Sequence, residues 1–184
     1  MKKKKVLVRG PALSQTGYGE QCRFALRSLR SREDLFDIFL LNIPWGGTNW
    51  IFEDNDERKW IDDLIIKTKP LVEQQKQNPA VPLFDISLQV TIPNELQRMA
   101  PENIIYTAGM ETDRVAAIWT GKCHEMADKL LVISEHAKSG FEKSVKATLP
   151  NGDEVDFVLE KPIEVVHYPV KKIKTKDLNL NLDT

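Results

Sequence analysis

Two short apolar segments of the chain end in polar residues whose side chains could take part in chemistry. Residues 104–112 read IIYTAGMET, and residues 130–135 read LLVISE. Each pattern is typical of a strand that leads through a loop into a helix. Ligands of an open parallel α/β sheet bind beyond the carboxyl ends of its strands. We therefore regard Glu111 and Ser134 as candidate site residues, and the carboxylate of Glu111 could orient or deprotonate a substrate hydroxyl.

Each of these candidates also has a structural interpretation. A carboxylate at position 111 complements the dipole of the helix that follows it, and composition alone slightly favours that role. Ser134 is well placed to be the N-cap of the next helix. Asn94 and Glu95 follow a third strand-like segment and have the same two interpretations.

A glycine-rich loop opens the first helical segment. The backbone N–H groups of Gly17, Tyr18 and Gly19 could bind a phosphate or a carboxylate, because glycine permits close approach and a helix begins with partial positive charge. With Gly10 included, the spacing still differs from the dinucleotide fingerprint G-x-G-x-x-G. A loop that needs glycine only to enter a helix explains the pattern equally well.

Other reactive residue types favour structural roles. Arg23, Arg27 and Arg30 share one face of the first helix, which favours a solvated basic stripe. Cys123 and His124 are neighbours on a predicted helix and would face apart, so a thiol dyad is disfavoured. The histidines are too scattered to suggest a metal site.

Strand-like and helix-like segments alternate along the chain. Strands are predicted at residues 4–9, 36–41, 84–90, 103–107, 129–133 and 163–167, and helices follow Gly19, Asn55, Thr112 or Asp113, and Ser134. The second helix is expected to span residues 56–68, just before Pro70, with a surface loop at residues 73–82. Val115, Ile118, Trp119 and Met126 are predicted to form the buried stripe of the third helix. The short connections imply a Rossmann-like, doubly wound parallel α/β sheet with helices on both faces. Asn151-Gly152 predicts a small β-hairpin excursion near residues 147–159.

The composition indicates one globular domain. The chain has 184 residues, of which 41% are hydrophobic, and a net charge of -1 that gives no reason to expect nucleic acid as a partner. The apolar run at residues 6–8, behind the lysines at 2–5, is too short for a signal sequence or a membrane span. Two cysteines suggest neither a disulfide framework nor a metal cage. We expect a cytoplasmic protein with reduced thiols.

Several short motifs follow one another in a specific order. They are VLVRGP with GYG near the start, IPNE at residues 92–95, TAGMETDR at residues 107–114 and VISEHAKSGF at residues 132–141. Together they resemble the N-terminal domain of GT-B fold glycosyltransferases of the group 1 or family four kind. The resemblance implies an acceptor-side domain at residues 1–170, a polar tail or interdomain linker at residues 171–184, and a donor-binding C-terminal domain that this chain lacks.

This resemblance also implies a reaction and a set of site residues. Such enzymes transfer a sugar from a nucleotide-sugar donor to an acceptor hydroxyl, here with retention and without a bound metal or cofactor. Glu111 lies where many relatives have a catalytic or acceptor-contacting His or Asp. The residues expected to bind the acceptor or the donor phosphates are Gly17, Tyr18, Gly19, Asn94, Glu95, Ser134 and Lys138.

Two other kinds of function are open to the same sequence. Because a fold does not fix a function, the chain could be a stand-alone Rossmann-like binding module without catalytic activity. A nucleotide-dependent oxidoreductase is disfavoured by the missing fingerprint. Without a donor domain, the isolated chain is expected to be inactive as a transferase.

Overall fold

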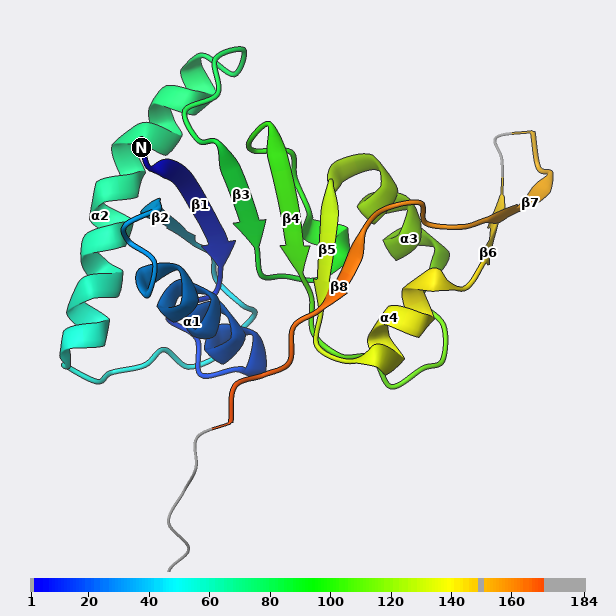
Figure 1. Ribbon diagram of the computed structural model, residues 1–184, viewed down its shortest axis with the longest axis horizontal. Coiled ribbons are helices and arrows are strands. Elements are labelled where there is room, and N and C mark those ends of the chain that lie inside the picture. Colours follow the sequence, from blue (N-terminus) through cyan, green and yellow to red (C-terminus); the bar gives the residue numbers. More distant parts are fainter. Residues whose placement is uncertain (1, 149–150, 171–184) are drawn as a thin grey trace, which may run out of the picture.

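Six parallel strands form one sheet at the centre of the fold (Figure 1). The computed structural model describes residues 2–148 and 151–170, so the predicted linker at 171–184 lies outside the described residues. The strands lie in the order β2-β1-β3-β4-β5-β8. Their bounds are Lys4–Gly10 for β1, Phe36–Asn42 for β2, Ile86–Gln89 for β3, Glu102–Tyr106 for β4, Lys129–Val132 for β5 and Ile163–Val165 for β8.

Helices cover both faces of this sheet, which confirms the predicted Rossmann-like α/β class. Their bounds are Gly17–Arg30 for α1, Asp56–Gln77 for α2, Ala117–Met126 for α3 and Glu135–Glu142 for α4, with a 3₁₀ turn, η1, at Pro93–Glu95. Leu26 of α1 is buried in one cluster with Val6 and Val8 of β1. Phe141 of α4 is buried with Val132 of β5 in a second cluster, on the opposite face.

The direction in which the strands are added changes between β1 and β3. The chain passes from β1 to β2 on one side and then returns to place β3 on the other side of β1. The connections after β1 and β3 therefore leave the sheet in opposite directions. In sheets of this kind, ligands bind at such a switch point, beyond the carboxyl ends of the two strands.

Helix α2 is longer than the sequence predicted. The expected helix ended just before Pro70 and a surface loop followed, but the helix continues to Gln77. Proline cannot donate to the carbonyl of Ile66, four residues earlier. The side chain of Ile66 is 70% exposed, so that carbonyl lies on the solvent side of the helix. Beyond the proline, Val72 is buried with Leu7, and this packing favours the last helical turns.

Side chains of α2 also cover the outer edge of β2. The backbone N–H of Leu40 donates to Thr68 Oγ1 (2.7 Å), and that hydroxyl donates to the carbonyl of Leu64 (2.7 Å). Lys67 Nζ donates to the carbonyl of Ile38 (3.2 Å). Backbone groups that an edge strand leaves unpaired are thus bonded to a helix.

Helix α3 begins later than predicted. Thr112 and Asp113 were expected to cap it, but it starts at Ala117 and has no side-chain cap. The shift rotates the buried face, so that Ile118 is 63% exposed whereas Cys123 is fully buried. The predicted stripe is therefore wrong at Ile118, whereas Val115 is buried and Trp119 and Met126 are partly buried in one cluster. The segment before the helix packs against α4 instead of joining the helix.

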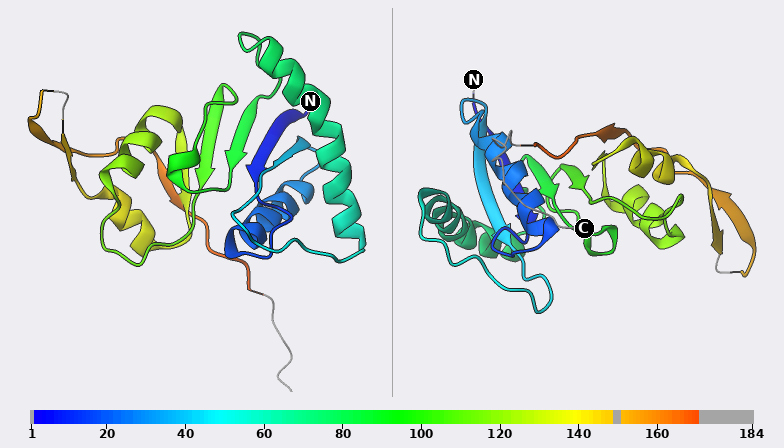
Figure 2. Two further views of the ribbon diagram at one scale, coloured as in Figure 1. Left: turned by 180° about the vertical axis from the view of Figure 1, so that it is seen from behind. Right: turned by 90° about the horizontal axis from the view of Figure 1, so that it is seen from below.

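A two-stranded antiparallel hairpin confirms the predicted excursion. Its strands are β6 (Val145–Thr148) and β7 (Glu154–Phe157). Gly152 in the connection has a φ of +91°, a conformation that favours glycine. Figures 1 and 2 show the hairpin projecting from the end of the molecule opposite α2.

We expect Thr68→Val to destabilise the fold by about 1–3 kcal/mol, because it leaves the buried N–H of Leu40 without its acceptor while the volume hardly changes. Urea unfolding followed by circular dichroism measures this change. Thr148→Val, at an exposed position of β6, is the control and should leave the transition in place. Equal stability of the Thr68 variant and the wild type would show that the edge bond contributes nothing.

Candidate functional site

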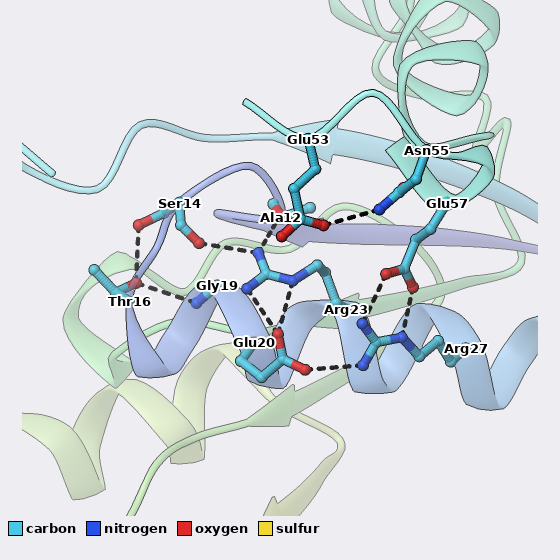
Figure 3. A network of polar contacts seen from close by, with 10 residues as sticks. All are labelled: Ala12, Ser14, Thr16, Gly19, Glu20, Arg23, Arg27, Glu53, Asn55 and Glu57. Carbon is cyan, nitrogen blue, oxygen red and sulfur yellow. Dashed lines mark hydrogen bonds and ion pairs between the residues drawn. The ribbon is translucent and has the colours of Figure 1, made fainter. Parts of the chain in front are cut away.

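A buried arginine shapes the loop between β1 and α1 (Figure 3). Arg23 of α1 is only 7% exposed. Its guanidinium donates to the carbonyl oxygens of Ala12 (2.7 Å) and Ser14 (2.9 Å) and pairs with the carboxylate of Glu20 at 2.7 Å. The loop at the switch point is thereby fixed to the helix that follows it.

The predicted solvated basic stripe on α1 is therefore wrong. Besides the buried Arg23, Arg27 donates to the carboxylate of Glu57 at 2.7 Å, and the guanidinium of Arg30 lies 4.5 Å from the ring centroid of Trp60. Helical spacing showed that the three arginines share a face. It could not show that α2 supplies the groups that face Arg27 and Arg30.

Charges in this network keep one another ionised. Hydrogen bonds from Arg27 lower the pKa of the Glu57 carboxyl. Burial raises the pKa of Glu20, but hydrogen bonds from Arg27 and Arg23 outweigh it, and the net shift is downward. Because Glu57 lies in the first turn of α2, the network also joins the two helices (Figure 3).

The two glycines of the predicted anion-binding loop have different roles. The amide of Gly19 donates to the capping hydroxyl of Thr16 (3.1 Å), so it already has a partner. A Cβ at Gly19 would lie 2.0 Å from the carbonyl oxygen of Ser14, which only glycine avoids. Gly17 has open space around it. The amides of Gly17 and Tyr18, at the start of α1, are the ones placed to bind an anion.

Five side chains meet beyond the carboxyl ends of β1, β3 and β4, and we call them the strand-end cluster. They are Arg9, Tyr18, Thr91, Glu95 and Thr107. Arg9 donates to the carbonyl oxygen of Glu95 (3.0 Å), and Thr91 Oγ1 donates to Glu95 Oε2 (2.7 Å). The hydroxyls of Tyr18 and Thr107 share a hydrogen bond of 3.2 Å. The structure thus brings two predicted residues, Tyr18 and Glu95, to the switch point.

The electrostatics of the cluster centre on Glu95. Burial raises the pKa of the Tyr18 phenol, and the charge of Glu95 adds to this effect. Burial lowers the pKa of Arg9, while the same carboxylate raises it. An arginine stays charged under either influence. The cluster therefore presents a fixed cation, a carboxylate and hydroxyl groups, which together suit a ligand rich in hydroxyl groups.

Tyr18 also has an aromatic partner from the connection after β2. The ring centroids of Tyr18 and Trp45 lie 4.5 Å apart, with planes tilted by 39°. This connection is held against the β1–α1 loop, since the amide of Gln15 donates to the carbonyl of Asn49 (2.9 Å). Trp50 is 46% exposed beside it.

Glu111 lines a separate pocket in the connection after β4. The pocket has a volume of about 400 Å³, and its lining consists of Gly109, Met110, Glu111, Thr112, Val115, Ala116 and Trp119. Val115 is buried at its base, whereas Glu111 is exposed. Most of the lining is apolar, so a carboxylate at the mouth would fix the orientation of a ligand.

Contacts with α4 brace this connection. His136 Nε2 lies 3.0 Å from the carbonyl oxygen of Thr112. Lys143 Nζ donates to the carbonyl oxygen of Asp113 (2.8 Å) and lowers the pKa of its carboxyl. A Cβ at Gly109 would lie 2.8 Å from the side chain of Ile133, so glycine permits close packing there.

The remaining predicted site residues have structural partners or lie on the surface. Ser134 Oγ accepts a hydrogen bond from the amide of Ala137 (3.1 Å), as the N-cap of α4. Lys138 Nζ lies 3.8 Å from a carboxylate oxygen of Glu142 on the same helix. Asn94 is exposed in η1, next to the strand-end cluster in sequence.

The cysteines do not form reactive centres. Burial raises the pKa of Cys22 and of Cys123 to about 12, which makes both thiols poor nucleophiles. The ring of His124 packs edge-on against the ring of Phe157, with 5.2 Å between the ring centroids. Within residues 2–148 and 151–170, no group of three or more His, Cys, Asp or Glu side chains could hold a metal ion. No helix in the same part of the chain is long and apolar enough to cross a membrane.

Sequence reasoning missed Arg9, Thr91 and Thr107 of the strand-end cluster. Each is a polar residue at the end of an apolar run, which is the signal that selected Glu111. Arg9 was overlooked because it lies inside the predicted first strand. Trp119 belongs to the predicted buried stripe, and no local pattern indicates that α3 begins as late as Ala117.

The fold defines a Rossmann-like α/β domain, and the strand-end cluster is its candidate site at the switch point of the sheet. No protein-family model and no curated protein sequence matches the chain. Among solved structures, it is similar to the crystal structure of Arabidopsis thaliana UGT89C1 complexed with UDP-L-rhamnose, with 17% sequence identity and a TM-score of 0.32. The match covers 73% of this chain and 46% of that one, so the chain spans less than half the length of that protein.

We expect Arg23→Met to destabilise the fold by about 2–3 kcal/mol, because the buried carbonyls of Ala12 and Ser14 lose their donor. Arg23→Lys should recover only part of this loss, since one ammonium cannot reproduce the forked donors of a guanidinium. Chemical denaturation measures both. The exposed Arg32→Met is the control, and an equally small effect at both positions would contradict the role of Arg23.

Proposed function

We propose that the chain is the acceptor-side domain of a GT-B glycosyltransferase that transfers a sugar from a nucleotide sugar to an acceptor hydroxyl, with retention. The observation that carries the proposal is the strand-end cluster, in which Arg9, Tyr18 and Glu95 lie beyond the carboxyl ends of parallel strands at the switch point. The connection that carries Glu111 begins beside this cluster, since the amide of Ala108 donates to the hydroxyl of Tyr18. The motif resemblance to family four enzymes agrees with this arrangement. The proposed reaction requires no bound metal or cofactor.

In this proposal the residues divide the work between binding and proton transfer. The amides of Gly17 and Tyr18, at the positive end of α1, face the donor phosphates. Arg9 and Glu95 hold hydroxyl groups of a substrate, and Glu111 accepts the proton of the attacking acceptor hydroxyl. The bond between the sugar C1 and the diphosphate oxygen breaks, and a bond from C1 to the acceptor oxygen forms on the same face of the sugar, which retains the configuration at C1. A donor-binding domain outside this chain stabilises the charge on the leaving diphosphate.

The proposal is tested by assaying a panel of nucleotide sugars for hydrolysis and transfer. The assay compares this chain with a longer product of the same gene that continues past Thr184 into a donor-binding domain. Transfer by the longer protein alone is the expected result. Absence of transfer in both, with this chain folded and binding a nucleotide sugar or a saccharide, would favour a binding module instead.

We expect Glu111→Gln in the longer protein to lower turnover by about 100-fold or more, because a positioned base commonly contributes that factor. Thermal unfolding should be unchanged, since the side chain is exposed. Glu33→Gln is the matched control, because Glu33 is an exposed carboxylate in the connection before β2, at the opposite end of the sheet. Full turnover in the Glu111 variant would show that this residue has no catalytic role.

A further inference from the structure

The pocket beside Glu111 combines an aromatic wall with a carboxylate at its mouth. Met110, Val115 and Trp119 supply apolar surface, and Glu111 and Thr112 supply the polar groups. Its volume of about 400 Å³ lies at the small end of the range for ligand sites. That size suits a single ring with its substituents.

Trp119 reaches this pocket because of where α3 begins. The helix starts at Ala117, so Trp119 lies in its first turn, next to the connection that carries Glu111. Thr120 and Cys123 take the fully buried positions of the helix. Trp119 is left half-buried, with part of its indole against the core and part lining the pocket.

The pocket is held in shape without a ligand. The backbone N–H of Val115 donates to the carbonyl of Gly140 in α4, at 3.4 Å. Thr112 Oγ1 donates to the carbonyl of Arg114 (2.8 Å) and closes the turn behind Glu111. Together with the bonds from His136 and Lys143, these contacts hold the backbone of the pocket in place, which lowers the entropic cost of binding.

We propose that this pocket binds a ring-bearing alcohol, with an apolar face of the ring against Trp119 and Met110 and one hydroxyl donating to the carboxylate of Glu111. Naming this molecule the acceptor rests on the proposed function, whereas the binding itself does not. A pyranose and a phenol share the required chemistry, because each joins a flat or nearly flat apolar face to a hydroxyl group. An indole wall takes either ring by stacking.

Binding is tested on this chain, without any donor, by ¹⁹F NMR after replacement of its four tryptophans by 5-fluorotryptophan. Single Trp→Phe variants assign the four resonances. The probes are methyl α-D-glucopyranoside, a pyranose, and 4-methylumbelliferone, a phenol, with ethylene glycol as the hydroxyl compound without a ring. A saturable shift of the Trp119 resonance with at least one ring probe, and none with ethylene glycol, is the expected result. Which probe binds distinguishes a sugar acceptor from an aromatic one.

Two variants connect the shift to the proposed contacts. Glu111→Gln should weaken binding at least tenfold, because a charge-assisted hydrogen bond becomes a neutral one, whereas Glu33→Gln should leave the dissociation constant unchanged. No shift with either ring probe would overturn the proposal. A shift of the Trp45 resonance alone would also overturn it, and would assign the ligand to the strand-end cluster.

The two proposals fail in different ways. Binding at Trp119 without transfer by the longer protein would support the proposed binding site and contradict the proposed glycosyltransferase activity. Unchanged transfer in Trp119→Leu, with circular dichroism showing that this variant is folded, would support the proposed activity and contradict the proposed binding site.

Discussion

The pairing of β1 with β2 on one side and β3 on the other is the constraint on which the rest of the structure depends. A strand buried on both faces and paired along both edges has only its ends available for polar groups. A polar side chain that is to contact a ligand must therefore lie near the strand ends, and the reversal of strand order separates the connections there. Arg9 is an example, since it lies near the end of a strand that is paired on both sides and bonds to the connection after β3.

The two parts of the candidate site are mechanically connected through Tyr18. Its hydroxyl bonds to Thr107 and accepts a hydrogen bond from the amide of Ala108, at the start of the connection that carries Glu111. Its ring lies on Trp45. A ligand that displaces this phenol would therefore act on three connections together. Arg23 limits such movement, because it holds two carbonyls of the β1–α1 loop by hydrogen bonds from α1.

Local patterns in the sequence predicted the sheet, its hairpin and the N-cap at Ser134, since apolar periodicity and turn residues act over short distances. The errors arose where distant contacts prevail over local preference. Burial of Val72 favours the continuation of α2 beyond Pro70. Hydrogen bonding to α4 keeps the segment before α3 from joining that helix. For the site, strand ends indicated the right region, and Tyr18 and Glu95 meet there. The partners of Arg23 could not be read from helical spacing, because two of them are backbone carbonyls of the loop before its helix.

The side chains of α2 that bond along β2 make the two edges of the sheet unequal. At β2, Thr68 and Lys67 occupy backbone groups to which another strand would otherwise pair. At the opposite edge, β8 contributes only three residues. The β2 edge is therefore closed to a further strand at these positions. Edge-to-edge stacking of sheets into fibres, which needs both edges, is blocked on that side.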